Sequence, residues 1–330
     1  MNKNYRFAVP EKKKIRLIVD TDCKNEADDQ FAVAHFLMTD KFIVKGLIAS
    51  HFEMNHYIYG KEKTMAASLA EINKVVDIMG LTDEYEHKIF PGAVTALDNE
   101  IIPNFSVIAA HGGAEELLRN AAPKPSWGSE FRIEEALQTD DDRPLFIACL
   151  GSLTNLASAI LARPEICERM TAVCIVGGPY PTGGFEFNLM QDIAAANVVF
   201  SSAMPLWQIP ENAFKQIAVS LAELQVRVAP YGDIGEYLFT QMVEFNDRMG
   251  DVLGWPPGES WGIGDQVTIT VLLEEGRRGN YEWRPAPVVS PDMFYVQNPN
   301  SRVIKVYNSL DVRFTMEDFY AKLMLNYGNK

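Results

Sequence analysis

The sequence predicts an α/β fold, in which helices flank an open, mostly parallel sheet of the Rossmann-like kind. Short apolar runs of strand length alternate with amphipathic stretches of helix length from residue 15 to the end of the chain. Two of these runs, 145–149 and 173–176, are apolar without interruption. Strands of a parallel sheet that is covered on both faces have this pattern, because both sides of each strand are buried.

The expected elements follow one another without a long linker or an internal repeat, which favours one domain spanning 1–330. Strands are expected at 15–19, 42–50, 144–150, 171–176, 205–210 and 302–308. Helices are expected at 28–38, 58–80, 113–121, 131–138, 152–163, 192–202, 216–228 and 316–325, with a further helical block in 230–280. The Pro-, Gly- and Ser-containing segment 123–130 is expected to be a surface loop.

Composition restricts the kinds of partner and the compartment. The chain has a net charge of −14 and no basic segment large enough to suggest binding to nucleic acid. It has no run of 18 apolar residues and no apolar region near the N-terminus, so we expect neither a membrane span nor a signal peptide. We therefore expect a cytoplasmic protein. Its four cysteines form no CxxC pair and are expected to be reduced core residues.

An acidic loop follows the first expected strand. The segment DTDCKNEADDQ, residues 20–30, places five carboxylates within ten residues between that strand and the first expected helix. Like charges this close repel one another unless a cation neutralises them, and oxygen ligands favour a hard cation such as Ca²⁺ or Mg²⁺. A calcium loop of the EF-hand type is excluded, because its sixth position is Asn25 and its twelfth is Phe31.

Three further loops also follow expected strands and would open at the same edge of the sheet, where ligands bind in such folds. They are GSLTN at 151–155, VGG at 176–178 continuing to EFN at 186–188, and Gly264-Asp265. Glycines allow the backbone to approach a ligand closely, and carboxylate or amide groups bind hydroxyls. Taken alone, GSLTN could be a helix N-cap and EFN a surface turn.

In combination, these loops resemble the inosine–uridine-preferring nucleoside hydrolase family. The segment DTDCKNEADD resembles the family's DxDxGxDD with two additional residues, and GSLTN and VGG resemble its LTN and MGG motifs. The segment FEFNLMQD resembles the EFN motif of the family, and HGG at 111–113 resembles its HGxxGL. The resemblance spans about 15 to 275 and implies a nucleoside-hydrolase-like α/β fold.

The resemblance also implies a metal site and a reaction. One Ca²⁺ per subunit would be held by the carboxylates of Asp22, Asp29 and Asp265 and by the backbone carbonyl of Leu150. A water bound to that ion, deprotonated by Asp22 as general base, would attack the anomeric carbon of a ribonucleoside or related N-riboside and release free base and ribose. Asp20 would support the ligands from behind. Family members assemble as homodimers or homotetramers, so we expect the same here.

The resemblance assigns the ribose hydroxyls to Asp28, Glu186 and Asn188, and with less support to Glu53 after the second strand. Many relatives have a His before the last aspartate that protonates the leaving base, where this chain has Gly264. His111 is the first candidate to replace it, unless it is a loop histidine bonded to backbone. Trp261 could stack on the base, or be a core aromatic.

Three other positions complete the expectations. Tyr180 lies where relatives have an asparagine for the ribose 5′-hydroxyl, and His35 on the first helix is expected to be a packing residue. Two alternatives to the hydrolase stay open. One is a metal-dependent riboside-binding protein whose catalysis is impaired by Gly264. The other is a phosphatase of the haloacid-dehalogenase type, which also begins with a strand and DxD but continues with a DGT-like segment that is absent here.

Overall fold

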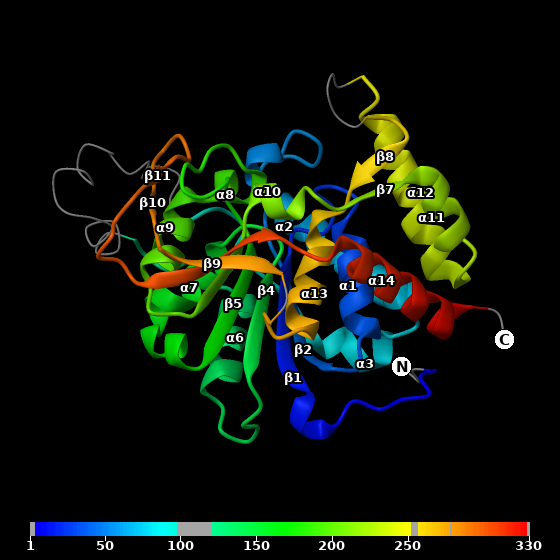
Figure 1. The fold of residues 1–330 in the computed structure, drawn as a ribbon, viewed down its shortest axis with the longest axis horizontal. Helices are drawn as coiled ribbons and strands as arrows, with labels where there is room; N and C mark the ends of the chain where they lie inside the picture. Colours follow the sequence, from blue (N-terminus) through cyan, green and yellow to red (C-terminus); the bar gives the residue numbers. More distant parts are fainter. Residues whose placement is uncertain (1–3, 98–120, 252–256, 278, 329–330) are drawn as a thin grey trace.

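The structure is a computed structural model that describes residues 4–97, 121–251, 257–277 and 279–328. Within them, an eight-stranded sheet forms the centre of the molecule, in the order β3-β2-β1-β4-β5-β6-β12-β9 (Figure 1). All neighbours are parallel except β9, which is antiparallel to β12. The strands are β1 (Ile15–Thr21), β2 (Phe42–Ala49), β3 (Ile89–Pro91), β4 (Leu145–Cys149), β5 (Met170–Ile175), β6 (Leu206–Ile209), β9 (Asn280–Pro285) and β12 (Val303–Ser309).

Helices cover both faces of this sheet (Figure 1), so its central strands are buried on both sides. In β1, Leu17 packs into one core cluster and the next residue, Ile18, into the other. Alternation of side chains along a strand explains this division. The helices are α1 (Asp29–Met38), α2 (Thr64–Ile78), α3 (Thr82–Tyr85), α6 (Trp127–Leu137), α7 (Thr154–Ala162), α8 (Phe187–Gln191), α9 (Ile193–Ser201), α10 (Glu211–Phe214), α11 (Leu221–Arg227), α12 (Gly232–Arg248), α13 (Val267–Leu273) and α14 (Val312–Tyr327).

Two small antiparallel sheets lie outside the central one. They are formed by β7 (Ala218–Ser220) with β8 (Ser260–Gly262), and by β10 (Val288–Val289) with β11 (Tyr295–Val296). β8 leads directly into η5 (Gly264–Gln266), a single turn of 3-10 helix before α13. The two ends of the chain lie close together (Figure 1), and the Asn4 side chain donates to the Leu325 carbonyl at 3.0 Å.

The predicted fold class is confirmed, and each of the six expected strands is present. Two local expectations are wrong. Segment 216–228 begins with β7 before α11, and α6 begins inside the expected loop, because Ser126 caps its N-terminus by accepting from the Ser129 backbone N–H at 3.1 Å. The expected helix at 58–80 forms only from Thr64. Apart from residue 121, the expected helix at 113–121 lies outside the described residues.

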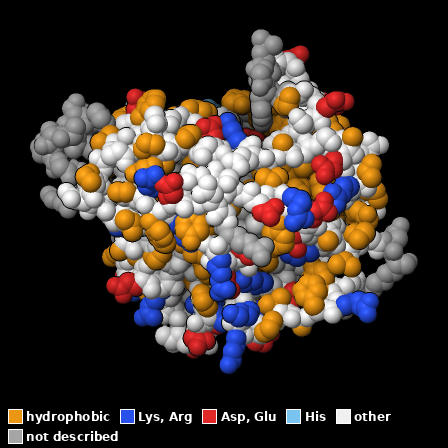
Figure 2. Space-filling view, viewed as in Figure 1, with side chains coloured by type: hydrophobic (Ala, Val, Ile, Leu, Met, Phe, Trp, Pro, Cys, Tyr) orange, Lys and Arg blue, Asp and Glu red, His pale blue; other side chains and the backbone are white. Residues whose placement is uncertain are grey.

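On the face drawn in Figure 2, Asp and Glu are interspersed with Lys and Arg, so negative charge is not concentrated on this face. Several carboxylates are instead buried inside the protein. Within the described part of the chain, no helix combines the length and apolarity that crossing a membrane requires. All four cysteines are free and buried, as expected.

Candidate active site

A cavity of about 380 Å³ opens at the carboxyl ends of β1, β4 and β5. This volume lies within the range of roughly 300–1,000 Å³ that is usual for small-molecule sites. The acidic and amide groups that line it are Asp22, Asn25, Glu26, Asp28, Asp29, Asn55, Glu186, Asn188, Glu211 and Asp265. The apolar groups include Phe52, Tyr57, Ile58, Phe185, Phe187, Phe214, Phe245 and Met249. The cavity therefore combines acidic groups with aromatic walls.

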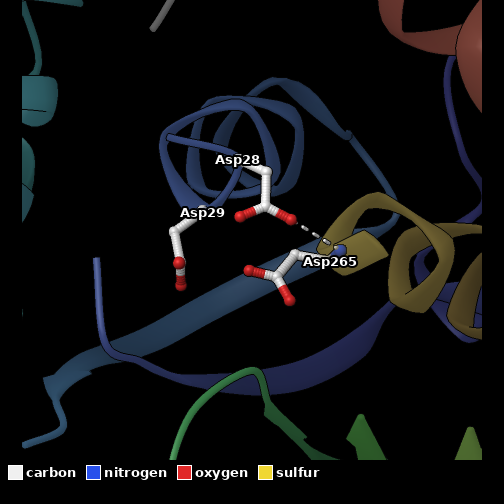
Figure 3. A group of neighbouring side chains, drawn as sticks. All are labelled: Asp28, Asp29 and Asp265. Carbon is white, nitrogen blue, oxygen red and sulfur yellow. Dashed lines mark hydrogen bonds between the residues drawn. The ribbon is translucent and has the colours of Figure 1, made fainter. Parts of the chain in front are cut away.

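Three buried carboxylates converge in this cavity. Asp28 and Asp29 lie at the start of α1, and Asp265 lies in η5 (Figure 3). Each offers a carboxylate oxygen, and these oxygens lie within 4.8 Å of one another. The Asp265 backbone N–H donates to Asp28 Oδ2 at 3.4 Å, and the Thr21 hydroxyl donates to Asp29. We call these three residues the carboxylate trio.

The electrostatics of the trio favour a cation. Burial raises the pKa of Asp28 to about 6, and burial together with the Asp28 charge raises the pKa of Asp29 to about 7. Burial and the neighbouring aspartates hold the pKa of Asp265 well above its usual range, and the same causes raise that of Glu26 to about 8. A divalent ion would relieve this repulsion.

Asp22 adds a fourth carboxylate to the same cavity wall. It is 2% exposed, and its Oδ2 has no hydrogen-bond partner among the described residues. Burial and then the Asp29 charge hold its pKa well above the usual range. A buried oxygen without a partner is costly unless a ligand satisfies it. The donor set, carboxylate oxygens only, fits a hard ion such as Ca²⁺. Of the expected ligands, Asp29 and Asp265 belong to the trio, and Asp22 and Leu150 line the same cavity; the third member of the trio is Asp28, which was expected to bind ribose.

The GSLTN loop supports this wall from behind. A Cβ on Gly151 would lie 2.9 Å from Asp22 Cγ, so only glycine lets the loop pass so close to that carboxylate. Asn155 accepts from the Ala93 backbone N–H at 2.7 Å and donates to Asp20 Oδ1 at 3.2 Å. The loop therefore supports Asp22 and Asp20 without lining the cavity itself. Leu150, the residue just before the loop, does line it.

Asp20 lies behind the cavity and does not line it. Its carboxylate pairs with Arg132 of α6, which is fully buried, and accepts from the Ser50 hydroxyl. Sequence reasoning did not find Arg132, since a single arginine in an amphipathic helix has no distinguishing pattern. The pair connects α6 to the end of β1 directly below the acidic loop.

Replacing Arg132 by Leu is expected to lower the free energy of unfolding by about 3–5 kcal/mol, because it leaves the Asp20 charge buried and unpaired. Denaturation in urea would measure the change. Arg143→Leu is a suitable control, since Arg143 forms its ion pairs at the surface and its loss should cost far less. Equal losses in the two variants would contradict the importance of the buried pair.

Glu186 and Asn188 form the opposite wall, at the start of α8. Glu186 caps this helix by accepting from the backbone N–H groups of Asn188 and Leu189, at 3.0 and 2.9 Å, and also from that of Gly177 at 2.7 Å. Asn188 donates to the carbonyls of Leu150 and Ile175 at 2.7 and 3.0 Å. The Leu150 carbonyl keeps a second lone pair for another partner. Both side chains are thus fixed in place and still line the cavity.

Two residues that were expected to contact the substrate do not line the cavity. Trp261 is only 1% exposed, packs edge-to-face on Phe245 and does not line the cavity; Phe245 lies between it and the cavity wall. Glu53 turns away, accepting from the Thr64 hydroxyl and the Glu62 backbone N–H, so that Asn55 and Phe52 of the same segment line the cavity instead. In the first case a contacting aromatic residue from another element lines the cavity, and in the second case residues of the same segment do.

Three expectations concern the leaving base and the 5′ end. A Cβ on Gly264 would lie 2.8 Å from Phe214 Cδ2, so Phe214 occupies the space next to this glycine. Tyr180 donates to Gln297 at 2.5 Å and does not line the cavity, whereas Phe185 does. His111 lies outside the described residues.

Comparison with known proteins places this geometry in a family. The sequence model of the inosine-uridine preferring nucleoside hydrolases matches residues 17–317. A pyrimidine-specific ribonucleoside hydrolase RihA from Salmonella paratyphi B is 24% identical over 262 residues, which cover 77% of this chain and 78% of the relative.

Solved structures agree with the family match in fold. The purine-preferring ribonucleoside hydrolase from Gardnerella vaginalis superposes with a TM-score of 0.72 at 19% identity, covering 95% of this chain and 99% of that one. An inosine-uridine preferring nucleoside hydrolase from Bacillus anthracis gives a TM-score of 0.63 at 16% identity, over 94% and 99% of the two chains. The match leaves no support for the haloacid-dehalogenase alternative. The resemblance read from the loops is confirmed: the chain belongs to the inosine-uridine preferring nucleoside hydrolase family, enzymes that hydrolyse ribonucleosides.

Proposed function

We propose that this protein hydrolyses the N-glycosidic bond of ribonucleosides or related N-ribosides with the help of one Ca²⁺ per subunit, giving free base and ribose. The observation that carries the proposal is the convergence of the carboxylate trio with the unpartnered Asp22 oxygen in one cavity of nucleoside size. Family membership supports the reaction, and the donor set supports the ion.

Asp29 and Asp265 would hold the ion, with Asp22 and Asp28 on either side of them and the Leu150 carbonyl as a further oxygen donor. When bound, Ca²⁺ supplies Lewis-acid polarisation of water and of the sugar hydroxyls. Asp22 would accept the proton of the attacking water as general base, because its carboxylate is buried in the cavity wall and Oδ2 has no other described partner.

The sugar would lie against the acidic part of the cavity. Asp28, Glu186 and Asn188 would bind its hydroxyls; all three line the cavity, and hydrogen bonds to the backbone fix Glu186 and Asn188. Cleavage of the N-ribosyl bond develops positive charge on the ring, which surplus negative charge around the site stabilises. The aromatic walls, with Phe187 and Phe245 among them, would pack against the base.

From the sequence, His111 is our candidate for protonating the leaving base, because Gly264 stands where many relatives have a histidine; His111 lies outside the described residues. A second candidate function, riboside binding with impaired catalysis, is favoured by the same glycine. We also propose assembly into a homodimer or homotetramer, from the family resemblance, and a cytoplasmic location, from the composition. A base preference is not assigned, because one named relative is pyrimidine-specific and another purine-preferring.

The test is incubation of the protein, loaded with Ca²⁺, with a panel of purine and pyrimidine ribonucleosides and other N-ribosides, with release of base and ribose followed by chromatography. We expect release from at least one member of the panel. Calorimetric binding of ribosides without any product would favour the binding protein. The absence of both binding and product would contradict the proposal. The matching 2′-deoxyribonucleosides serve as a control, since they lack a hydroxyl that the acidic groups would bind.

A further inference from the structure

A buried histidine connects the two chain segments that supply the carboxylate trio. His35 lies on α1, six residues after Asp29, which corresponds to roughly 9 Å along the helix axis. Its Nδ1 lies 2.7 Å from the side-chain oxygen of Gln266, the residue that follows Asp265. Both His35 and Gln266 are fully buried. One hydrogen bond thus connects the helix that carries Asp28 and Asp29 to the turn that carries the third carboxylate, 231 residues later.

The other ring nitrogen is held just as closely. His35 Nε2 lies 2.9 Å from Oδ2 of Asp318 on α14. Asp318 also pairs with Lys322, which donates to the Thr39 hydroxyl at 2.9 Å at the end of α1. The ring of Phe319 packs on the His35 ring with centroids 5.4 Å apart. The imidazole therefore has a fixed orientation, and it presents Nδ1 to Gln266.

The bridge does not depend on the protonation state of the ring. Burial lowers the pKa of His35, so the neutral ring with one N–H is favoured at pH 7. That N–H can serve the Asp318 carboxylate while the Gln266 amide, turned about its last bond, donates to Nδ1. A protonated ring would instead donate to both oxygens. In either case the ring connects Gln266 to Asp318.

Asp265 needs such a support. Its segment η5 has only three residues, and its bonds to α1 run through the trio itself: the Asp265 backbone N–H donates to Asp28 at 3.4 Å, and the Asp265 carboxyl group hydrogen-bonds Asp29. The carboxyl–carboxylate bond requires a proton on one of the two groups. When all three groups are ionised and no cation is bound, the Asp28 and Asp29 charges repel the Asp265 carboxylate, because the three carboxylate oxygens lie within 4.8 Å of one another. A turn held weakly would move away from α1 under this repulsion, and the three oxygens would no longer lie within reach of one ion.

We propose that His35 is a positioning residue for the cation site: by holding Gln266, it keeps Asp265 at the distance from Asp28 and Asp29 that one ion requires. This inference rests on the cation binding put forward above. Groups that orient metal ligands from behind typically change metal affinity or activity by about 10–100-fold when removed. His35 would act in this way through the backbone of η5, without touching substrate.

The test compares variants that break different halves of the bridge. His35→Leu removes both hydrogen bonds. His35→Asn places an amide near the position of Nδ1 and should keep the Gln266 bond, whereas His35→Gln reaches toward the position of Nε2 and should keep only the Asp318 bond. Thr315→Val is the matched control, because it breaks the buried Thr270–Thr315 hydroxyl bond between α13 and α14 and leaves Gln266 untouched.

The readout is the dissociation constant for Ca²⁺, measured by calorimetry on the full chain, together with the midpoint of urea unfolding. We expect His35→Leu and His35→Gln to raise the dissociation constant about 10–100-fold, with His35→Asn and Thr315→Val close to the unmodified protein. If His35→Leu lowers stability but leaves the dissociation constant unchanged, His35 is a structural residue only and the inference fails alone. If the unmodified protein itself binds no Ca²⁺, both this inference and the metal part of the proposed function fail.

Discussion

The variant Asp22→Asn is expected to lower kcat by about 10²–10⁴-fold, the usual contribution of a general base. Asn has nearly the same size and cannot accept the proton of the attacking water at neutral pH. Asp22 is buried against Gly151, so a change of shape at this position would disturb the loop, whereas the amide keeps the shape. Steady-state kinetics on whichever nucleoside the panel identifies would give kcat and KM separately.

The matched control is Asp233→Asn, the same chemical change at an exposed position on α12. It should leave kcat unchanged. Since Asp22 also faces the proposed ion, the Asp22→Asn assay is run at saturating Ca²⁺, and calcium binding is measured beside it. A loss of kcat below about threefold in an otherwise folded, calcium-loaded variant would contradict the assignment of Asp22 as the base.

Removing Ca²⁺ with a chelator is expected to abolish activity and to lower the melting temperature, by more at pH 8 than at pH 5.5. In the metal-free protein the pKa values of Asp28, Asp29 and Glu26 are raised to about 6, 7 and 8. Ordinary carboxyl pKa values are about 4. The folded state therefore favours the protonated forms, and this stabilisation is present below about pH 4 and is lost as pH rises through 6 to 8. Differential scanning calorimetry with and without Ca²⁺ would measure both effects.

A bound cation reverses this sign, since it favours the ionised carboxylates, so the stabilisation by Ca²⁺ should grow with pH. Asp29→Asn removes one of the titrating groups and should reduce the dependence on pH in the metal-free protein. A calcium-induced shift of the melting temperature that is the same at pH 5.5 and pH 8 would contradict the coupling between the trio and the ion.

Much of the site was predictable because its carboxylates lie in short, dense motifs. The acidic loop concentrates charge that has no structural explanation, and this density identified Asp22, Asp28 and Asp29 from the sequence. Asp265 has no such neighbourhood: the sequence indicated only a loop at Gly264-Asp265, and its role as a metal ligand came from the family resemblance. The division of roles among the aspartates was less predictable, because Asp22, Asp28 and Asp29 all line one cavity and their spacing in the sequence does not reveal which oxygens converge.

The aromatic walls could not be predicted, since their residues come from four separate segments and each reads as ordinary core. Trp261 has the large aromatic side chain expected of a stacking residue, but Phe245, which packs on it, is the aromatic residue that lines the cavity. The strands show the same contrast. β1 and β4 are buried on both sides and were visible as apolar runs, whereas the edge strand β9 has the sequence NYEWRP and is largely exposed. Exposure of this kind removes the periodic signal on which sequence reasoning depends.

The contact between Gly264 and Phe214 restricts how this chain and its histidine-bearing relatives can be converted into one another. A histidine at 264 would introduce a Cβ 2.8 Å from the phenyl ring, so Gly264→His alone would disturb α10 before it could offer a proton to the base. Phe214 must first become smaller, and that step opens a void in the cavity wall while position 264 is still glycine. The two substitutions are thus epistatic, each unfavourable without the other.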